Sequence, residues 1–177
     1  RLSALSPVER AEILERWAAP AEAGIAPVAD AVAGDGLLGL AQRFARQAAA
    51  TPERIALIAC GEAHCGESAT DTRISYRDLD ARADCIARRL RAEGVGPGEL
   101  VGVFLRRSID MVASLLGILK TGAAYLPLDP SYPPQRLAYM LADSGAALLL
   151  GENALLTRLP EAQTRVLRIE DIDRELD

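Results

Sequence analysis

Three side chains of the kind that binds zinc lie close together in the sequence: Cys60, His64 and Cys65. Two thiolates and an imidazole are suitable zinc ligands, but a closed structural site needs a fourth ligand, usually from a second paired cluster. The sequence holds no other histidine, and its third cysteine, Cys85, stands alone. We therefore interpret this stretch as a turn between two strands and predict no metal site.

Gly94, Gly96 and Gly98 form the second cluster that could carry chemistry, because glycine-rich loops bind phosphates. They precede a predicted strand, whereas a dinucleotide-binding loop follows a strand and opens a helix, so that its amides point at the phosphate. The position of these glycines indicates a turn instead. The Walker pattern, which ends in Gly-Lys-Ser/Thr, does not occur in the sequence.

Asp110 and Asp129 are the carboxylates nearest to the predicted junctions between strands and helices. Asp129 is followed by Pro130, and this pair is more typical of a turn than of a general base. No serine lies in a nucleophile-elbow pattern, and the single histidine cannot be matched to a nucleophile and an orienting carboxylate. We therefore predict no catalytic, cofactor-binding or metal-binding residue in this chain.

The composition is that of a folded, acidic protein. Of the 177 residues, 50% are hydrophobic and 25% are charged, and the formal net charge is −5. A nucleic-acid-binding protein needs a basic surface for the phosphates, so the charge speaks against that class. No apolar stretch reaches the roughly 18 residues of a membrane span. An odd number of cysteines without a signal region favours the cytoplasm, and the chain reads as one domain cut from a longer polypeptide.

The first part of the chain combines helices, a linker and a hairpin. Ser6, Pro7 and Glu9 predict the start of a short amphipathic helix that runs to Ala18, and residues 20–36, rich in Ala, Gly and Pro, predict a linker. A second helix is expected over residues 37–50, because Thr51-Pro52 ends it. Short strands over residues 55–59 and 73–76, joined by a polar loop, predict a hairpin.

Helices and apolar strands alternate through the rest of the chain. Ser75 and Asp78 form a capping pattern before a helix whose apolar face carries Leu79, Ala83, Ile86 and Leu90. We expect strands over residues 100–105, 123–128, 146–150 and 164–169, separated by helices over residues 108–120, around residues 137–141 and over residues 154–159. In the strand over residues 123–128, Tyr125 is expected in the core, and Pro127 is tolerable only at a sheet edge or a strand end. This alternation predicts a three-layer α/β domain, with helices on both faces of a mostly parallel sheet.

Several motifs closely resemble those of nonribosomal peptide synthetase adenylation domains, which belong to the ANL superfamily of adenylate-forming enzymes. The specific one is LKTGAAYLPLDP at residues 119–130, in which Thr121 replaces the commoner alanine. The runs ISYRDL at residues 74–79 and YPPQRLAYMLAD at residues 132–143 resemble two further hallmarks. Residues 44–56 are similar to the usual start of the domain, and LSPVERAEILERW at residues 5–17 is similar to the end of a condensation domain and the linker after it.

The resemblance implies two parts: a condensation-to-adenylation linker at residues 1–36 and an incomplete N-terminal portion of an adenylation domain at residues 37–177. The complete domain would use ATP and Mg²⁺ to convert an amino acid into its aminoacyl-adenylate, and would then load it on the phosphopantetheine thiol of a carrier protein. Condensation and carrier domains, and an MbtH-like protein, are the implied partners. The family's phosphate loop, specificity pocket and catalytic lysine lie downstream of Asp177, so no site residue is carried over and this segment alone is expected to be inactive.

Two alternatives stay open at this point. The chain could be part of an acyl- or aryl-acid ligase of the same superfamily, although the condensation-like leader and the YLPLDP run favour the amino-acid branch. It could also be a non-catalytic module that serves as a docking surface through its first helix and linker.

Overall fold

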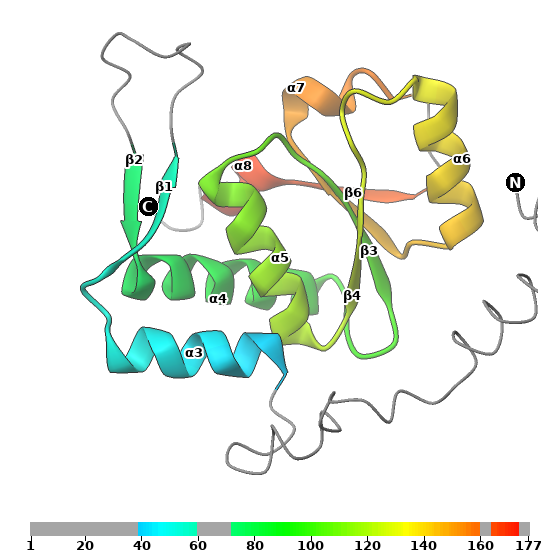
Figure 1. Cartoon of the computed structure of the whole chain (residues 1–177). Coiled ribbons are helices and arrows are strands. Elements are labelled where there is room, and N and C mark those ends of the chain that lie inside the picture. Colours follow the sequence, from blue (N-terminus) through cyan, green and yellow to red (C-terminus); the bar gives the residue numbers. More distant parts are fainter. Residues whose placement is uncertain (1–38, 60–71, 160–163, 174–177) are drawn as a thin grey trace, which may run out of the picture. The chain divides into compact units, whose positions relative to one another are not determined.

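The computed structural model describes residues 39–59, 72–159 and 164–173 (Figure 1). The predicted helix before Ala18, the linker over residues 20–36 and the Cys60, His64 and Cys65 cluster lie outside the described residues. The elements follow in the order α3 (Leu40–Ala50), β1 (Ile55–Ala59), β2 (Thr72–Ser75), α4 (Tyr76–Ala92), β3 (Leu100–Phe104), α5 (Ile109–Thr121), β4 (Ala124–Pro127), α6 (Pro134–Ser144), β5 (Leu148–Gly151), α7 (Asn153–Leu156), β6 (Arg165–Arg168) and α8 (Ile169–Asp173).

The predicted hairpin is confirmed, since β1 and β2 pair antiparallel. One boundary was wrong: Tyr76, expected at the end of the second strand, opens α4 instead. The Ser75 hydroxyl accepts a hydrogen bond from the Asp78 amide at 3.1 Å, and this cap starts the helix one residue earlier than the strand pattern suggests. The Tyr76 ring then packs 5.7 Å from the ring of Phe44, between α4 and α3.

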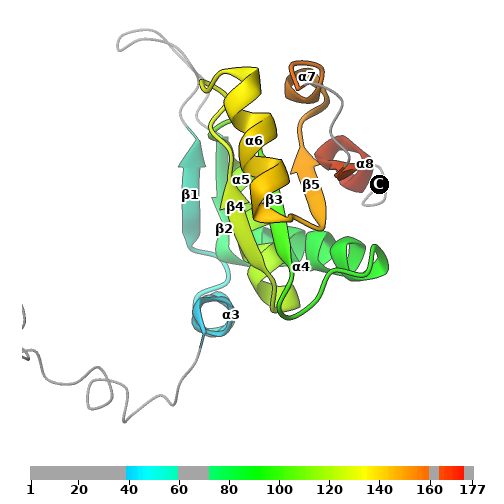
Figure 2. The same cartoon turned by 90° about the vertical axis from the view of Figure 1, so that its right-hand side faces the viewer.

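The main sheet is parallel and has four strands, in the order β4-β3-β5-β6. Helices α4 and α5 lie on one side of it, and α6 and α7 lie on the other (Figure 1). The view from the side shows α6 in front of the sheet and α5 behind it (Figure 2). The predicted three-layer α/β architecture is thereby confirmed.

Side chains of the central strands alternate between two hydrophobic cores, as the pleat of a strand requires. Val101, Val103, Leu148 and Leu150 pack with α4 and α5, whereas Phe104 and Leu149 pack with α6 and α7. All six are buried. Two buried faces explain why these strands read as continuous apolar runs in the sequence.

Strand β4 lies at the edge of the sheet and ends at Pro127. The amides of Ala124 and Leu128 each donate to a carbonyl beside them on the β3 side at 2.9 Å. Backbone nitrogens alternate in direction along a strand, so the nitrogen of Pro127, next to Leu128, faces away from β3. The predicted place for Pro127 is therefore confirmed. Tyr125, expected in the core, is 38% exposed, because its side chain comes from an edge strand.

Helices α4 and α5 pack against each other at very short range. A methyl group on Gly117 would lie 2.9 Å from Ile86 Cβ and 3.0 Å from the Ala83 carbonyl oxygen, so only glycine fits there without displacement. At the far end of α5 the Lys120 ammonium bonds Asp80 at 2.7 Å and Asp84 at 2.5 Å, both on α4. The described residues contain no helix long and apolar enough to cross a membrane.

We predict that Gly117→Ala lowers the free energy of unfolding, measured by urea denaturation. The added methyl meets the α4 backbone, and overpacking of this kind costs about 1–3 kcal/mol. Because the methyl meets backbone and not only a movable side chain, we expect a cost in the upper part of this range, above the roughly 1 kcal/mol gained in helix propensity. Gly96→Ala is the matched control, because nothing lies within 4 Å of its added methyl. An equal free energy of unfolding for the two variants would contradict the prediction, because it would show that α4 and α5 accommodate the methyl without losing stability.

We also predict that Lys120→Met destabilises the fold at pH 7 by about 1–3 kcal/mol, because it leaves the carboxylates of Asp80 and Asp84 without their charged donor. Arg77→Met is the control: it removes an ion pair with Glu53 in which both side chains are largely exposed, and such pairs contribute about 0–1 kcal/mol.

The same interaction predicts a pH dependence. Burial lowers the pKa of Lys120, but the hydrogen bonds and charges of Asp80 and Asp84 outweigh burial, so its pKa lies above 10.5. A pKa raised by folding gives stability that is complete below 10.5 and disappears as the pH rises through the folded-state value. The difference between wild type and Lys120→Met should therefore shrink above about pH 10.5. A constant difference would contradict this assignment.

Candidate functional site

The strand order creates a crevice at one end of the main sheet. The connection from β3 to β4 runs through α5 on one face, whereas the connection from β4 to β5 runs through α6 on the opposite face. The loops after β3 and β4 therefore leave toward opposite faces of the sheet. Because the two strands are neighbours, a crevice opens between these loops. Open α/β sheets bind ligands at such points, outside the carboxyl ends of the strands.

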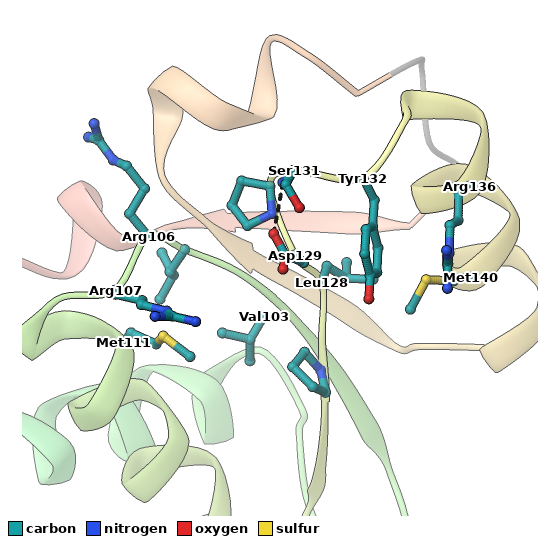
Figure 3. Close-up of a pocket in the computed structure, with 13 residues that line it drawn as sticks. Val103, Arg106, Arg107, Met111, Leu128, Asp129, Ser131, Tyr132, Arg136 and Met140 are labelled. Atoms are coloured by element: carbon teal, nitrogen blue, oxygen red, sulfur yellow. Dashed lines mark hydrogen bonds between the residues drawn. The ribbon is translucent and has the colours of Figure 1, made fainter.

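A cavity of about 870 Å³ lies at this point (Figure 3). Its apolar part comes from the two strands and their flanking helices, through Val103, Leu128, Met111 and Met140. Its charged and hydrogen-bonding side chains are Arg106, Arg107, Asp129, Ser131, Tyr132 and Arg136. Three guanidinium groups against one carboxylate make the lining cationic.

The three arginines are held differently. Arg106 pairs with Glu152, whose carboxylate accepts from the Arg106 backbone amide and from Nε, each at 2.7 Å; the Arg106 side chain points away from the crevice (Figure 3). Arg136 stacks its guanidinium 4.2 Å from the centre of the Tyr132 ring. Arg107 points toward the middle of the crevice (Figure 3). Arg107 and Arg136 are therefore the cations that a bound anion could approach.

Asp129 is the carboxylate of the crevice, and it is part of a turn. Its Oδ1 accepts from the Ser131 amide at 2.8 Å, and its carbonyl accepts from the Tyr132 amide at 3.0 Å. Hydrogen bonds from the backbone and side chain of Ser131 lower the pKa of Asp129, helped by the charge of Arg107. A group with a lowered pKa is a poor general base near neutral pH. The prediction of a turn at Asp129-Pro130 is confirmed.

The other predicted candidates do not reach this crevice. Asp110 lies in the first turn of α5 and pairs with Arg82 at 2.6 Å, which links α5 to α4. Gly94 and Gly98 have φ angles of 87° and 88° and form the turn that leads into β3, at the opposite end of that strand. Across the ranges that the structure describes, no group of three or more His, Cys, Asp or Glu side chains could hold a metal ion.

Sequence reasoning missed the crevice residues Arg107, Tyr132 and Arg136. One signal was present: Arg106 and Arg107 directly follow a buried strand, where a parallel sheet opens to ligands. Arg136 and Tyr132 could not be placed from the sequence, because the position of α6 depends on the order of the strands.

The Asp129 turn gives a test by NMR titration of the carboxyl carbon. Ser131→Pro removes the amide donor and should raise the pKa of Asp129 toward 3.8, the ordinary value. Ser131→Ala removes only the hydroxyl and should raise it less. An unchanged pKa in Ser131→Pro would show that this hydrogen bond does not hold the carboxylate.

Comparison with known proteins identifies the family. Residues 44–176, from α3 to beyond α8, match the sequence profile of the AMP-binding enzymes. A dimodular nonribosomal peptide synthase of Bacillus subtilis (strain 168) is 36% identical over 161 residues, which make up 91% of this chain and 6% of that protein. The chain spans only 2–6% of the length of the curated relatives it matches.

Two solved structures share the fold. The nonribosomal peptide synthetase FmoA3 superposes with a TM-score of 0.66 at 36% identity, over 75% of this chain and 13% of that one. The N-terminal subdomain of NpsA from Klebsiella oxytoca gives a TM-score of 0.67 at 22% identity, over 78% and 32% of the two chains. The resemblance to peptide synthetase adenylation domains that the motifs predicted is confirmed, and the chain belongs to the family of AMP-binding enzymes.

Proposed function

We propose that this chain is the N-terminal portion of a nonribosomal peptide synthetase adenylation domain that activates an amino acid with ATP. The observation that carries the proposal is the match of residues 44–176 to the AMP-binding enzymes, with peptide synthetases among the relatives. The solved forms of FmoA3 support the nucleotide, since they hold AMPPNP or α-methyl-L-serine-AMP.

In the complete domain, the amino-acid carboxylate attacks the α-phosphate of ATP, and pyrophosphate leaves as the aminoacyl-adenylate forms. The acyl group would then pass to the thiol of a phosphopantetheine arm on a carrier protein, with AMP as the leaving group. Mg²⁺ and a cationic side chain would offset the charge that develops on the phosphates.

Apart from the charges of Arg107 and Arg136, the described residues do not fit the triphosphate or the Mg²⁺ of this reaction. The loops after β3 and β4 contain arginine, serine and proline rather than a glycine-rich run, so they offer no row of backbone amides for a phosphate chain. Asp129 is the one carboxylate among the described residues that lines the crevice, and its Oδ1 already accepts from the Ser131 amide, so the crevice offers Mg²⁺ at most one oxygen that is free of this bond. We therefore propose that the reactive groups lie outside residues 1–177.

The role of this segment is then to build the framework. Its parallel sheet fixes the crevice between β3 and β4, which we propose as one wall of a larger ligand-binding region. We further propose that residues 1–36 are the linker from a preceding condensation domain; an alignment that spans 91% of the chain supports a similar leader in a relative.

The proposed partners are the condensation domain before this segment, the carrier protein after the adenylation domain, and an MbtH-like protein. NpsA has been solved as an artificially fused adenylation–PCP di-domain, but at 21% identity that likeness concerns the fold alone. The cytoplasmic location stays a prediction. An aryl-acid ligase is the second candidate, because NpsA was solved with 3-hydroxyanthranilyl-AMSN, but at 22% identity that likeness concerns the fold alone.

The test is pyrophosphate exchange, measured with a panel of amino acids and aryl acids. We expect the complete adenylation domain of the parent synthetase to exchange pyrophosphate with an amino acid, and the 177-residue chain to give only background. Exchange with aryl acids alone would favour the second candidate. Clear exchange by the 177-residue chain would show that reactive groups lie within it.

A further inference from the structure

The charges of the crevice after β3 and β4 do not cancel. Glu152 neutralises Arg106, since its carboxylate accepts from the backbone amide and from Nε of that residue at 2.7 Å each. Within the described ranges, Arg107 and Arg136 form no such ion pair, and Asp129 is the one carboxylate that lines the crevice. Two guanidinium groups against one carboxylate leave a single net positive charge.

Arg107 is the more available of these two cations. The guanidinium of Arg136 stacks 4.2 Å from the centre of the Tyr132 ring, and this contact already counters part of its charge. Arg107 is exposed and points toward the middle of the crevice (Figure 3). Asp129 does not take up Arg107 as Glu152 takes up Arg106, because its Oδ1 accepts from the amide of its own turn.

The walls around Arg107 offer an apolar surface. They carry side chains from the two strand segments and from both flanking helices, among them Val103, Leu128, Met111 and Met140. The volume of about 870 Å³ falls within the range of about 300–1,000 Å³ that is usual for small-molecule sites. A ligand that matches the crevice therefore combines a negatively charged head with an apolar body.

The net charge of the crevice limits the charge of that head. A carboxylate or a phosphodiester carries one negative charge, and its two oxygens match the paired donors of a guanidinium group. A triphosphate carries several charges and needs more donors than Arg107 and Arg136 supply. A neutral apolar molecule would cover Arg107 without pairing its charge, and the burial of an unpaired charge is costly.

We infer that the crevice binds an organic monoanion, with its carboxylate or phosphodiester head on Arg107 and its apolar body against the walls that carry Met111 and Met140. The inference rests on the proposed function, because it names the ligand class for the wall of the ligand-binding region proposed above.

The methionines of the chain report directly on this site. The sequence contains two, Met111 and Met140, and both line the crevice. Their isotope-labelled methyl groups can be followed by NMR while the 177-residue chain is titrated with a small molecule. Benzoate and methyl phenyl phosphate are the monoanionic probes. Benzamide, which is neutral but similar in shape to benzoate, and acetate, which lacks an apolar body, are the controls.

We expect at least one of the two probes to shift both methyl signals and to bind about 10-fold more tightly than benzamide and acetate, because it alone combines a charge-assisted contact with apolar burial. Tighter binding of benzoate assigns a carboxylate head to the ligand, and tighter binding of methyl phenyl phosphate assigns a phosphodiester head. The inference is overturned if neither probe shifts the methyl signals, or if neither binds more tightly than both controls.

Substitution identifies the residue that holds the head. Arg107→Gln should weaken binding of the probe by about 10-fold, and Arg107→Lys, which keeps the charge, should weaken it less. Arg43→Gln is the matched control, since Arg43 is exposed on α3 and does not line the crevice. It makes the same change in net charge and should leave the affinity within about 2-fold. Equal losses in Arg107→Gln and Arg43→Gln overturn the assignment of Arg107.

Pyrophosphate exchange by the complete adenylation domain separates the two proposals. Exchange with an amino acid, together with no binding of either probe to the crevice, contradicts only the monoanion site. Binding of a probe to the crevice, together with no exchange by the complete domain, contradicts only the proposed function.

Discussion

The burial of α5 between the parallel sheet and α4 is the constraint on which the rest of the structure depends. Because Gly117 has no side chain, α5 approaches α4 closely at this residue. At the end of α5, Lys120 forms ion pairs with two carboxylates of α4. The first turn of α5 then lies where β3 ends. The position of this one helix therefore determines where Arg107 and Met111 lie, and both residues line the crevice.

Features that depend on local chemistry could be predicted from the sequence. The Ser75 cap, the apolar face of α4, the turn at Asp129 and the alternation of strands and helices each follow from residues close together in the chain. Pro127 could be assigned to an edge or an end because its ring removes a donor. Tyr125 shows the limit: its exposure depends on whether another strand covers β4, which no local pattern contains.

The crevice could not be predicted for a similar reason. It exists because the chain passes from β3 to β4 on one face and returns from β4 to β5 across the other, and this order is a property of the whole sheet. Only the pair Arg106-Arg107, directly after a buried strand, hinted at it. The family could be identified more readily than the site, because its most specific motif is one continuous run of residues that forms the end of α5 and β4.

Pro127 has a consequence for how the sheet can grow. Its nitrogen faces outward and carries no hydrogen, so a further strand placed beside β4 would find no donor there, close to the mouth of the crevice. A strand that pairs with β4 would therefore have to stop before Pro127 or leave one of its own acceptors without a partner there. A single imino acid thereby limits strand pairing along this edge at the end of β4 that borders the crevice.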